Sequence, residues 1–411
     1  MKKILLLLLC ISFLASAAEA KRYIVTIDNP TRYKVNWDSF VSRAGGEVVE
    51  TFDFIDGALL DLTEEQANRL IDRRAPGLTI EEDVVRYWLN DSSAIDDLKN
   101  YSKKRPSGKA PIPVAVPKAS VASVAGDGPA IKTTFPMNGE KPWGIDDLKL
   151  DNIWKITQGE DVKVAVIDTG INYNHPDLKD NYAGGYNALK PGTSAKDDHG
   201  HGTHVAGIIA AIKDGKGVVG VAPKAKLYGI KAMRKDGTGE MSAMVRAVQW
   251  AIDNKMNVVN MSISVADNFE ALHKALIDAE AHGITVVCSA GNDSGPVNYP
   301  AKYKETIAVS ASSPDGFYAP FTSHGPEIDI MAPGMYVPST SIDGKYQEMH
   351  GTSQAAPHVA GLAALAYNLG YKTPAKIREA IKKSAVPTEF VSANEQGAGI
   401  PNASKMKKAA E

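Results

Sequence analysis

Cysteine is the residue that this sequence has least of: two cysteines, Cys10 and Cys288, in 411 residues. Cys10 lies in an apolar leader, so a chain without the leader keeps only Cys288 and forms no internal disulfide. A disulfide scaffold is therefore excluded, and the fold must be stabilised by a large core. Cys288 follows the apolar residues Ile284–Val287, and we expect a buried, unreactive thiol there.

An excess of charge of either sign is also absent. Lys and Arg number 46 against 48 Asp and Glu, which leaves a formal net charge of −2. A chain without a strong net field has no general attraction for nucleic acid or for an anionic membrane surface. We therefore expect no nucleic-acid partner.

Long apolar runs are missing beyond the start of the chain. Met1-Lys2-Lys3, the apolar run Ile4–Leu14 and then Ala18-Glu19-Ala20 form the basic, apolar and small-residue regions of a secretory signal peptide. The run is too short to span a bilayer, so we expect removal of residues 1–20, secretion and no membrane span. A lipoprotein start at Cys10 is the alternative, disfavoured because leucines rather than small residues precede it.

Residues 21–90 have the pattern of a small α+β domain. Thr63-Glu64-Glu65-Gln66 is a capping box, because Thr accepts from a backbone N–H while Gln reaches back to the chain. The expected elements run β, α, β, β, α, β, and are Tyr23–Ile27, Trp37–Ala44, Glu47–Phe52, Ala58–Leu62, a helix through Leu70-Ile71 and the edge strand Glu81–Trp88.

The stretch that follows, residues 91–140, is rich in Lys, Pro, Ala, Ser and Val. Such a composition buries too little apolar surface to order itself, so a flexible linker is expected. Lys103-Lys104-Arg105 is a solvated basic patch or, alternatively, a place where the chain is nicked.

From residue 141 to 411 the pattern becomes α/β. Short apolar runs rich in β-branched residues alternate with helical stretches, which predicts a mostly parallel sheet flanked by helices. The predicted strands include Val162–Ile167, Lys226–Ile230, Val258–Met261, Thr285–Val287 and Thr306–Val309.

Three distant segments in this region supply an acid, an imidazole and a hydroxyl. Asp168 directly follows a predicted strand, where ligands collect in α/β sheets, although an isolated acid there often only caps a turn. His201 begins a predicted helix, and Ser353 precedes another whose first turn is expected to hold Pro357. The spacing of His199, His201 and His204 does not favour zinc.

Together these motifs resemble the catalytic domain of the subtilisin family from about Trp143 to Ala403, and the domain before them resembles its inhibitory prodomain. The matching pieces are Val164–Ile171, His201–Gly207, Gly220–Pro223, Asp236–Gly239, Ser289–Asn292, Met331–Gly334 and Gly351–Gly361. The order Asp, His, Ser along the chain is that of subtilisin.

The resemblance implies a role for each catalytic position. Ser353 would be the nucleophile, His201 the general base and then acid, and Asp168 the group that orients His201. Asn292 would supply the oxyanion-hole amide together with the Ser353 backbone N–H.

The resemblance also implies that substrate adds as a strand between two backbone segments. These are Gly237-Thr238-Gly239 and Ser262-Ile263-Ser264. Ser264 and Asn298 stand where the family usually has Gly, so we expect a narrower or more polar specificity pocket.

Asp177 and Asp214 match positions that ligate a structural calcium in subtilisins, although Gly139 replaces a side chain that the family uses. We expect calcium bound there and no organic cofactor.

The function expected is that of a secreted serine endopeptidase, a monomer that acts on polypeptides and is made as a self-processing zymogen with its prodomain as intramolecular inhibitor. A catalytically silent scaffold with the same fold and a processing protease dedicated to one partner are the alternatives.

Overall fold

The computed structural model describes residues 19–28, 35–72, 77–89, 120–122, 131–133 and 137–409. Its contacts divide the chain into two units, Met1–Asp83 and Val84–Glu411, and each is described by itself. The first unit thus ends before residue 90, where the sequence placed the end of the prodomain. Residues 1–18, which include Cys10, and Lys103-Lys104-Arg105 lie outside the described part of the chain.

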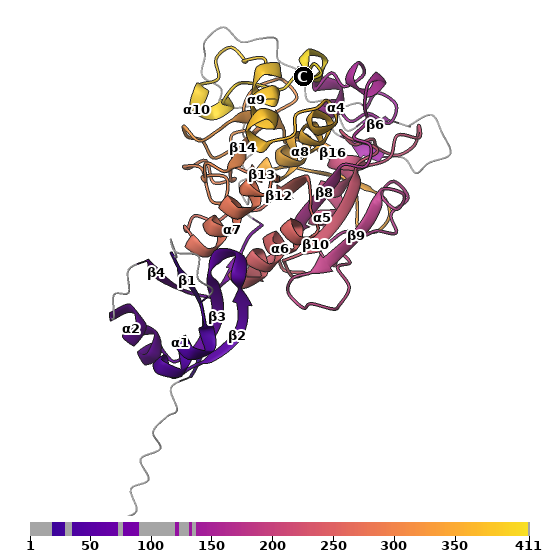
Figure 1. Cartoon of the computed structure of the whole chain (residues 1–411). Coiled ribbons are helices and arrows are strands. Elements are labelled where there is room, and N and C mark those ends of the chain that lie inside the picture. Colours follow the sequence, from indigo (N-terminus) through magenta and orange to yellow (C-terminus); the bar gives the residue numbers. More distant parts are fainter. Residues whose placement is uncertain are drawn as a thin grey trace, which may run out of the picture. The chain divides into compact units, whose positions relative to one another are not determined.

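The first unit is a four-stranded antiparallel sheet with two helices, drawn in indigo and purple in Figure 1. Its strand order is β2-β3-β1-β4. The elements are β1 (Lys21–Ile27), α1 (Trp37–Ala44), β2 (Glu47–Phe52), η1 (Asp53–Ile55), β3 (Gly57–Leu62), α2 (Glu64–Asp72) and β4 (Leu78–Glu82).

The predicted capping box at α2 is confirmed. The Thr63 N–H donates to Gln66 Oε1 at 2.7 Å, and the Gln66 N–H donates to Thr63 Oγ1 at 3.2 Å. Both helices then pack on one face of the sheet, where Val25 of β1 and Leu60 of β3 meet Trp37 of α1. This core gives the small unit an apolar interior of its own.

The last predicted strand of this unit, Glu81–Trp88, is wrong as a single element. β4 ends at Glu82, and a separate strand β5 (Val85–Tyr87) pairs antiparallel with β11 (Thr238–Glu240) in the second unit. The chain changes sheets because β11 offers a short, otherwise open edge whose backbone groups need partners.

The second unit is built on a seven-stranded parallel sheet with the order β15-β14-β13-β12-β8-β10-β9 (Figure 1). The predicted α/β class with a mostly parallel sheet is confirmed. The strands are β8 (Lys163–Asp168), β9 (Tyr182–Asn187), β10 (Lys226–Lys231), β12 (Val258–Met261), β13 (Thr285–Ser289), β14 (Thr306–Ser312) and β15 (Ile330–Pro333).

Helices cover both faces of this sheet, because successive strand residues point to opposite sides and both sets are buried. The longer helices are α5 (His201–Ala210), α6 (Met241–Asp253), α7 (Glu270–Ala281), α8 (Thr352–Asn368) and α9 (Pro374–Ser384). The remaining elements are α4 (Trp143–Asp147), η2 (Ile153–Lys155), β16 (Val337–Thr340), β17 (Tyr346–Met349), α10 (Ala393–Gln396) and η3 (Ala403–Lys405).

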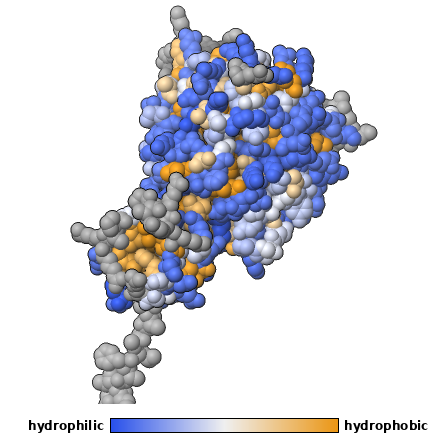
Figure 2. Space-filling view, in the orientation of Figure 1, coloured by the Kyte–Doolittle hydropathy of each residue, from blue (hydrophilic) through white to orange (hydrophobic). Residues whose placement is uncertain are grey.

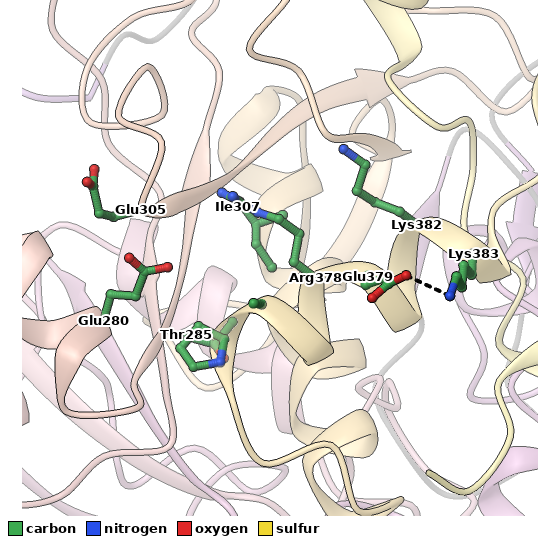
Figure 3. Close-up of a pocket in the computed structure, with 10 residues that line it drawn as sticks. Glu280, Thr285, Glu305, Ile307, Arg378, Glu379, Lys382 and Lys383 are labelled. Atoms are coloured by element: carbon green, nitrogen blue, oxygen red, sulfur yellow. Dashed lines mark ion pairs between the residues drawn. The ribbon is translucent and has the colours of Figure 1, made fainter. Parts of the chain in front are cut away.

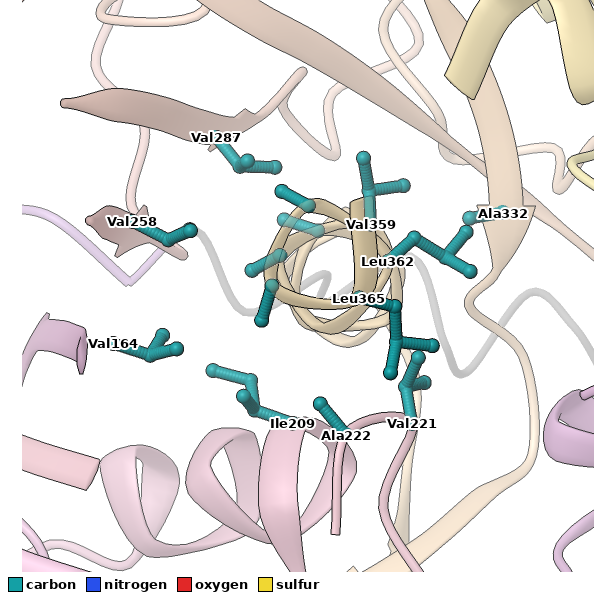
Figure 4. Packing of buried hydrophobic residues seen from close by; sticks show 14 of the residues in the cluster. Val164, Ile209, Val221, Ala222, Val258, Val287, Ala332, Val359, Leu362 and Leu365 are labelled. Carbon is teal, nitrogen blue, oxygen red and sulfur yellow. The ribbon is translucent and has the colours of Figure 1, made fainter. Parts of the chain in front are cut away.

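Helix α8 lies at the centre of the larger unit. Figure 4 shows its Val359, Leu362 and Leu365 surrounded by side chains from β8, β12, β13, β15 and α5. Every residue from Thr352 to Ala366 is buried, so the N-terminus of α8 is held by the whole core.

The reversal of strand order falls between β8 and β12. From β8 the chain first builds β9 and β10 on one side, and then β12 to β15 on the other. Crevices beyond the carboxyl ends of strands at such a switch point are where α/β proteins bind ligands. Asp168 ends β8 and Ser262 follows β12, so both lie at this switch point.

The predicted linker contains one described antiparallel pair, β6 (Ser120–Ala122) with β7 (Ile131–Thr133). Cys288 in β13 is fully buried, and burial raises the pKa of its thiol, as expected for an unreactive cysteine.

The surface of the larger unit that Figure 2 draws is mainly hydrophilic, with hydrophobic residues scattered over it. Among the residues that the structure describes, no helix has both the length and the apolar character needed to cross a membrane.

Candidate active site

Asp168 and His201 form a buried pair at the carboxyl edge of the sheet. Asp168 is the last residue of β8, and His201 is the first residue of α5. The His201 Nδ1 lies 2.8 Å from Asp168 Oδ1 and 2.9 Å from Oδ2, and the two side chains are 2% and 0% exposed. Because an ionised carboxylate only accepts, Nδ1 carries the ring proton and Nε2 is the nitrogen that can act as a base.

Asp197 holds the start of α5, a role that the sequence analysis missed. Its carboxylate accepts hydrogen bonds from the N–H groups of His199, Gly200 and Thr203 and from the hydroxyls of Thr169 and Thr203. Burial by itself would raise the pKa of Asp197, but these hydrogen bonds outweigh burial and lower it. The signal was present, since an acid just before a helix commonly binds its first N–H groups.

Lys231, the last residue of β10, bonds this strand to the turn that follows Asp168 in the neighbouring strand β8. Its Cα pairs with that of Asp168, and its buried Nζ donates to Thr169 O at 2.8 Å and to Met233 O at 2.9 Å. The same ammonium lies 2.6 Å from Asp198 Oδ1. Lys231 therefore connects the turn after Asp168, through Thr169, with the segment before α5, through Asp198.

Ser353 is the second residue of α8, as predicted for a serine at a helix N-terminus. Its Oγ donates to Ser262 O at 3.1 Å, while Ser262 Oγ donates to Ser353 O at 2.8 Å. The prediction that Pro357 lies in the first turn is wrong, because the helix already begins at Thr352. Pro357 has no N–H for the Ser353 carbonyl four residues earlier, and Ser262 supplies the missing donor.

Asn292 is oriented by the backbone of α8. Its Oδ1 accepts from Thr352 N at 2.8 Å and from Thr352 Oγ1 at 2.8 Å, which fixes the amide orientation and directs Nδ2 away from Thr352. A methyl carbon built on Gly351 would lie 2.9 Å from Gln354 Oε1, 3.4 Å from Asn292 Nδ2 and 3.5 Å from Ser353 N. The Asn292 amide nitrogen and the Ser353 backbone nitrogen therefore both lie beside Gly351, and we call this space the cradle.

The two predicted substrate-binding segments lie on either side of one extended stretch of the chain. Trp88 N donates to Gly237 O at 3.1 Å, and Ser264 N donates to Trp88 O at 3.0 Å. Thr238 and Gly239 pair with the same stretch through β11. Ile263 is buried, and its carbonyl accepts from Ser289 Oγ at 3.1 Å. Residues 84–89 thus occupy the groove in the second unit.

The two unusual pocket residues are both buried. Asn298 Nδ2 donates to Asp293 Oδ2 at 3.1 Å, and it crowds Gly291 in the same loop as Asn292. The expectation of a narrower or more polar pocket stays a prediction.

Asp177 and Asp214, the expected calcium ligands, lie close enough to interact electrostatically. Burial raises the pKa of Asp177, and the charge of Asp214 adds to this shift. Asp177 accepts from Val218 N and from the Tyr346 hydroxyl, both at 3.0 Å. Glu140, missed from the sequence, accepts the N–H of Asp214 at 3.1 Å.

Within the described ranges, no group of three or more His, Cys, Asp or Glu side chains is arranged to hold a metal. A calcium ion at Asp177 and Asp214 would therefore need backbone carbonyls as its further ligands, which suits calcium chemistry.

His204 is separate from the pair of His201 and Asp168. Its Nε2 lies 3.1 Å from the carbonyls of Val337 and Gln347, and burial lowers its pKa to about 3.

A cavity of about 490 Å³ lies elsewhere, lined by residues of α7, β13, β14 and α9. Figure 3 shows its charged rim, with Glu379 and Lys383 forming an ion pair of 2.6 Å. Asp168, His201 and Ser353 do not line it, so this cavity is separate from the candidate active site.

Comparison with known proteins identifies the family and agrees with the fold. Residues 159–399 match the model of the Subtilase family, and this chain belongs to that family. It is 40% identical over 268 residues to Subtilisin Savinase of Lederbergia lenta, covering 64% of this chain and 97% of that protein.

Two further relatives are matched over a smaller share of their own length. The chain is 40% identical to the Minor extracellular protease Epr of Bacillus subtilis, over 59% of this chain and 38% of that protein. It is 43% identical to the Thermostable alkaline protease of Halalkalibacterium halodurans, over 54% of this chain and 62% of that protein. The match thus spans less than two thirds of these two relatives.

The Gly351→Ala variant tests the cradle. The added methyl would lie near Asn292 Nδ2 and Ser353 N and only 2.9 Å from Gln354 Oε1, so the Gln354 side chain must move. The φ of +149° at this residue also disfavours a side chain. We expect peptide hydrolysis to fall by on the order of 10²–10³ in kcat, a magnitude taken from loss of one oxyanion donor in subtilisin itself, with little change in KM. The control is Gly344→Ala, where no atom lies within 4 Å of the added carbon. Equal activity of the two variants would contradict the assignment of the cradle.

Proposed function

We propose that this chain is the precursor of an exported serine endopeptidase that hydrolyses polypeptides through Asp168, His201 and Ser353. One observation carries the proposal. A buried Asp168–His201 pair lies at the end of β8, and Ser353, also buried, exchanges hydrogen bonds with Ser262 after the neighbouring strand β12. Asn292 Nδ2 and the Ser353 nitrogen both lie beside Gly351. This is the arrangement that acyl transfer requires.

The reaction starts from the Ser353 hydroxyl. His201 Nε2 takes its proton while Oγ forms a bond to the substrate carbonyl carbon, and the carbonyl electron pair moves onto its oxygen. The N–H of Ser353 and Nδ2 of Asn292 bind that oxyanion. Asp168 remains ionised and stabilises the imidazolium.

His201 then gives the proton to the leaving amine, whose bond to the carbonyl carbon breaks, and an acyl-enzyme remains on Ser353. Water repeats the sequence with His201 again as base, which releases the carboxylic acid. Before the attack the hydroxyl must turn from Ser262 O, its partner at 3.1 Å, toward His201. The reciprocal hydrogen bond from Ser262 Oγ meanwhile keeps the Ser353 backbone in place.

The zymogen state is supported by β5. Residues 84–89 add to β11 as a substrate strand would, and their backbone is bonded to both Gly237 and Ser264. We infer that this stretch blocks the groove until the chain is cut beyond Leu89. Export with loss of residues 1–20 belongs to the same proposal, and one relative is named an extracellular protease.

Self-processing is tested by the intact mass of the purified chain beside its Ser353→Ala variant, with calcium present. We expect the parent to split between Leu89 and Trp143 and the variant to stay whole, because the variant lacks the nucleophile. Ser404→Ala, which removes an exposed serine hydroxyl, is the matched control and must split like the parent.

Splitting of the Ser353→Ala variant at the same place would refute self-processing and point to a second protease. If no variant splits and casein is not hydrolysed, the endopeptidase function itself fails, and a catalytically silent scaffold is favoured instead.

Calcium at Asp177 and Asp214 is proposed as a structural ligand. A cation bound only by the folded state adds about 2.7 kcal/mol at one hundred times its Kd. We therefore expect a chelator to lower the Tm of the Ser353→Ala protein by about 5 °C or more, with recovery on adding calcium but not magnesium.

Asp214→Asn should remove most of this response, while Asp180→Asn, a change at an exposed acid nearby, should keep it. A Tm that is indifferent to the chelator in the parent would argue against the site.

A further inference from the structure

From Val85 to Trp88 every second side chain of the stretch faces the protein, and Leu89 after them is buried as well. Val85 and Tyr87 are 51% and 50% exposed, whereas Arg86 is half-buried and Trp88 is fully buried. This period of two follows from the extended backbone of β5 and its pairing with β11. Two pockets of the second unit therefore receive Arg86 and Trp88.

The pocket of Trp88 complements an indole ring in two ways. Its indole Nε1 donates to the Gly239 carbonyl at 2.9 Å, and its ring lies 6.4 Å from the ring of Phe269. Because the hydrogen bond is buried, a ring without an N–H would leave the carbonyl of Gly239 without this donor. Tryptophan thus gains both apolar burial and a hydrogen bond, whereas phenylalanine gains only the burial.

The pocket of Arg86 is more open. The Arg86 Nε donates to Asp267 Oδ2 at 3.0 Å, and the guanidinium lies 5.7 Å from the centre of the Phe269 ring. The side chains of Arg86 and Asp267 are 38% and 57% exposed, so solvent and salt screen the pair. Its contribution to binding is therefore smaller than that of Trp88 and falls with ionic strength.

The groups that form both pockets belong to the enzyme body. Gly239, Asp267 and Phe269 come from β11 and from the chain before α7, and they remain when residues 84–89 leave the groove. The backbone bonds of β5 to β11 depend on no side chain, so another extended polypeptide can repeat them.

We propose that the groove selects polypeptide substrates with a tryptophan in the pocket that Trp88 fills and, more weakly, a basic residue two positions before it. The specificity rests on the proposed endopeptidase function, because it describes the same groove. It makes Gly239 and Phe269 the main specificity determinants and Asp267 a secondary one.

The test uses quenched fluorogenic peptides that carry Val-Val-Arg-Tyr-Trp-Leu followed by a short Ala-Ser spacer. The enzyme is the protein that the full chain yields on maturation, with its concentration set by active-site titration. We expect kcat/KM to fall about tenfold when Trp is replaced by Phe, the value of one buried hydrogen bond. Replacement by Ala should lower kcat/KM by on the order of 10² or more.

Replacement of Arg by Glu should lower kcat/KM a few-fold in dilute buffer, and the difference should vanish in 1 M salt. In the Asp267→Lys variant the Glu peptide should have a higher kcat/KM than the Arg peptide. The variant should still hydrolyse the Trp peptide with a higher kcat/KM than the Phe and Ala peptides. Phe269→Ala should narrow the gap between the Trp and Ala peptides. Because Asp267 is exposed, its variant remains informative even if Phe269→Ala does not fold.

Casein hydrolysis by the same preparation separates this inference from the function on which it rests. Casein cleavage together with equal kcat/KM for the Trp, Phe and Ala peptides would overturn the specificity and leave the endopeptidase intact; Trp88 would then only anchor its own chain. Absence of hydrolysis of casein and of every peptide would overturn the endopeptidase function.

Discussion

The reversal of strand order between β8 and β12 is the constraint on which the site depends. Parallel strands end on the same edge, and neighbouring strands lie about 4.8 Å apart. Asp168 at the end of β8 and Ser262 after the end of β12 are therefore held close by hydrogen bonds of the sheet itself. The other catalytic residues are bonded to these two strand ends. His201 contacts Asp168 at the end of β8, and Ser353 exchanges hydrogen bonds with Ser262 after β12.

The core then holds the nucleophile in place through one helix. α8 is buried over nearly its whole length, so its first turn cannot shift without disturbing packing against the sheet and α5 (Figure 4). A proline at the sixth residue of this helix would normally weaken it. Because Pro357 has no N–H, the Ser353 carbonyl accepts a hydrogen bond from Ser262 Oγ instead. This bond connects the start of α8 to the end of β12.

Much of this was predictable from the sequence, and most of the failures have a common physical cause. Periodicity predicted five of the seven strands of the parallel sheet, all but β9 and β15, and the helix Trp37–Ala44. The motifs marked Asp168, His201 and Ser353 at element ends. Glu140 was missed because it accepts from the N–H of Asp214, 74 residues later, which only folding brings near. Asp197 was missed although its N–H partners are local and an acid before a helix is a recognisable cap. β5 was placed in the wrong sheet because its partner β11 lies some 150 residues away, and such pairing leaves no local signal.

The account claims that His201, oriented by Asp168, activates one serine above all others. The most direct measurement is labelling of the matured protein with a serine-directed organophosphonate, followed by peptide mapping, in the parent and in His201→Ala. The account predicts one label per chain, on Ser353, and a labelling rate that collapses in the His201→Ala variant. A label on another serine, or Ser353 labelled equally fast without His201, would contradict it.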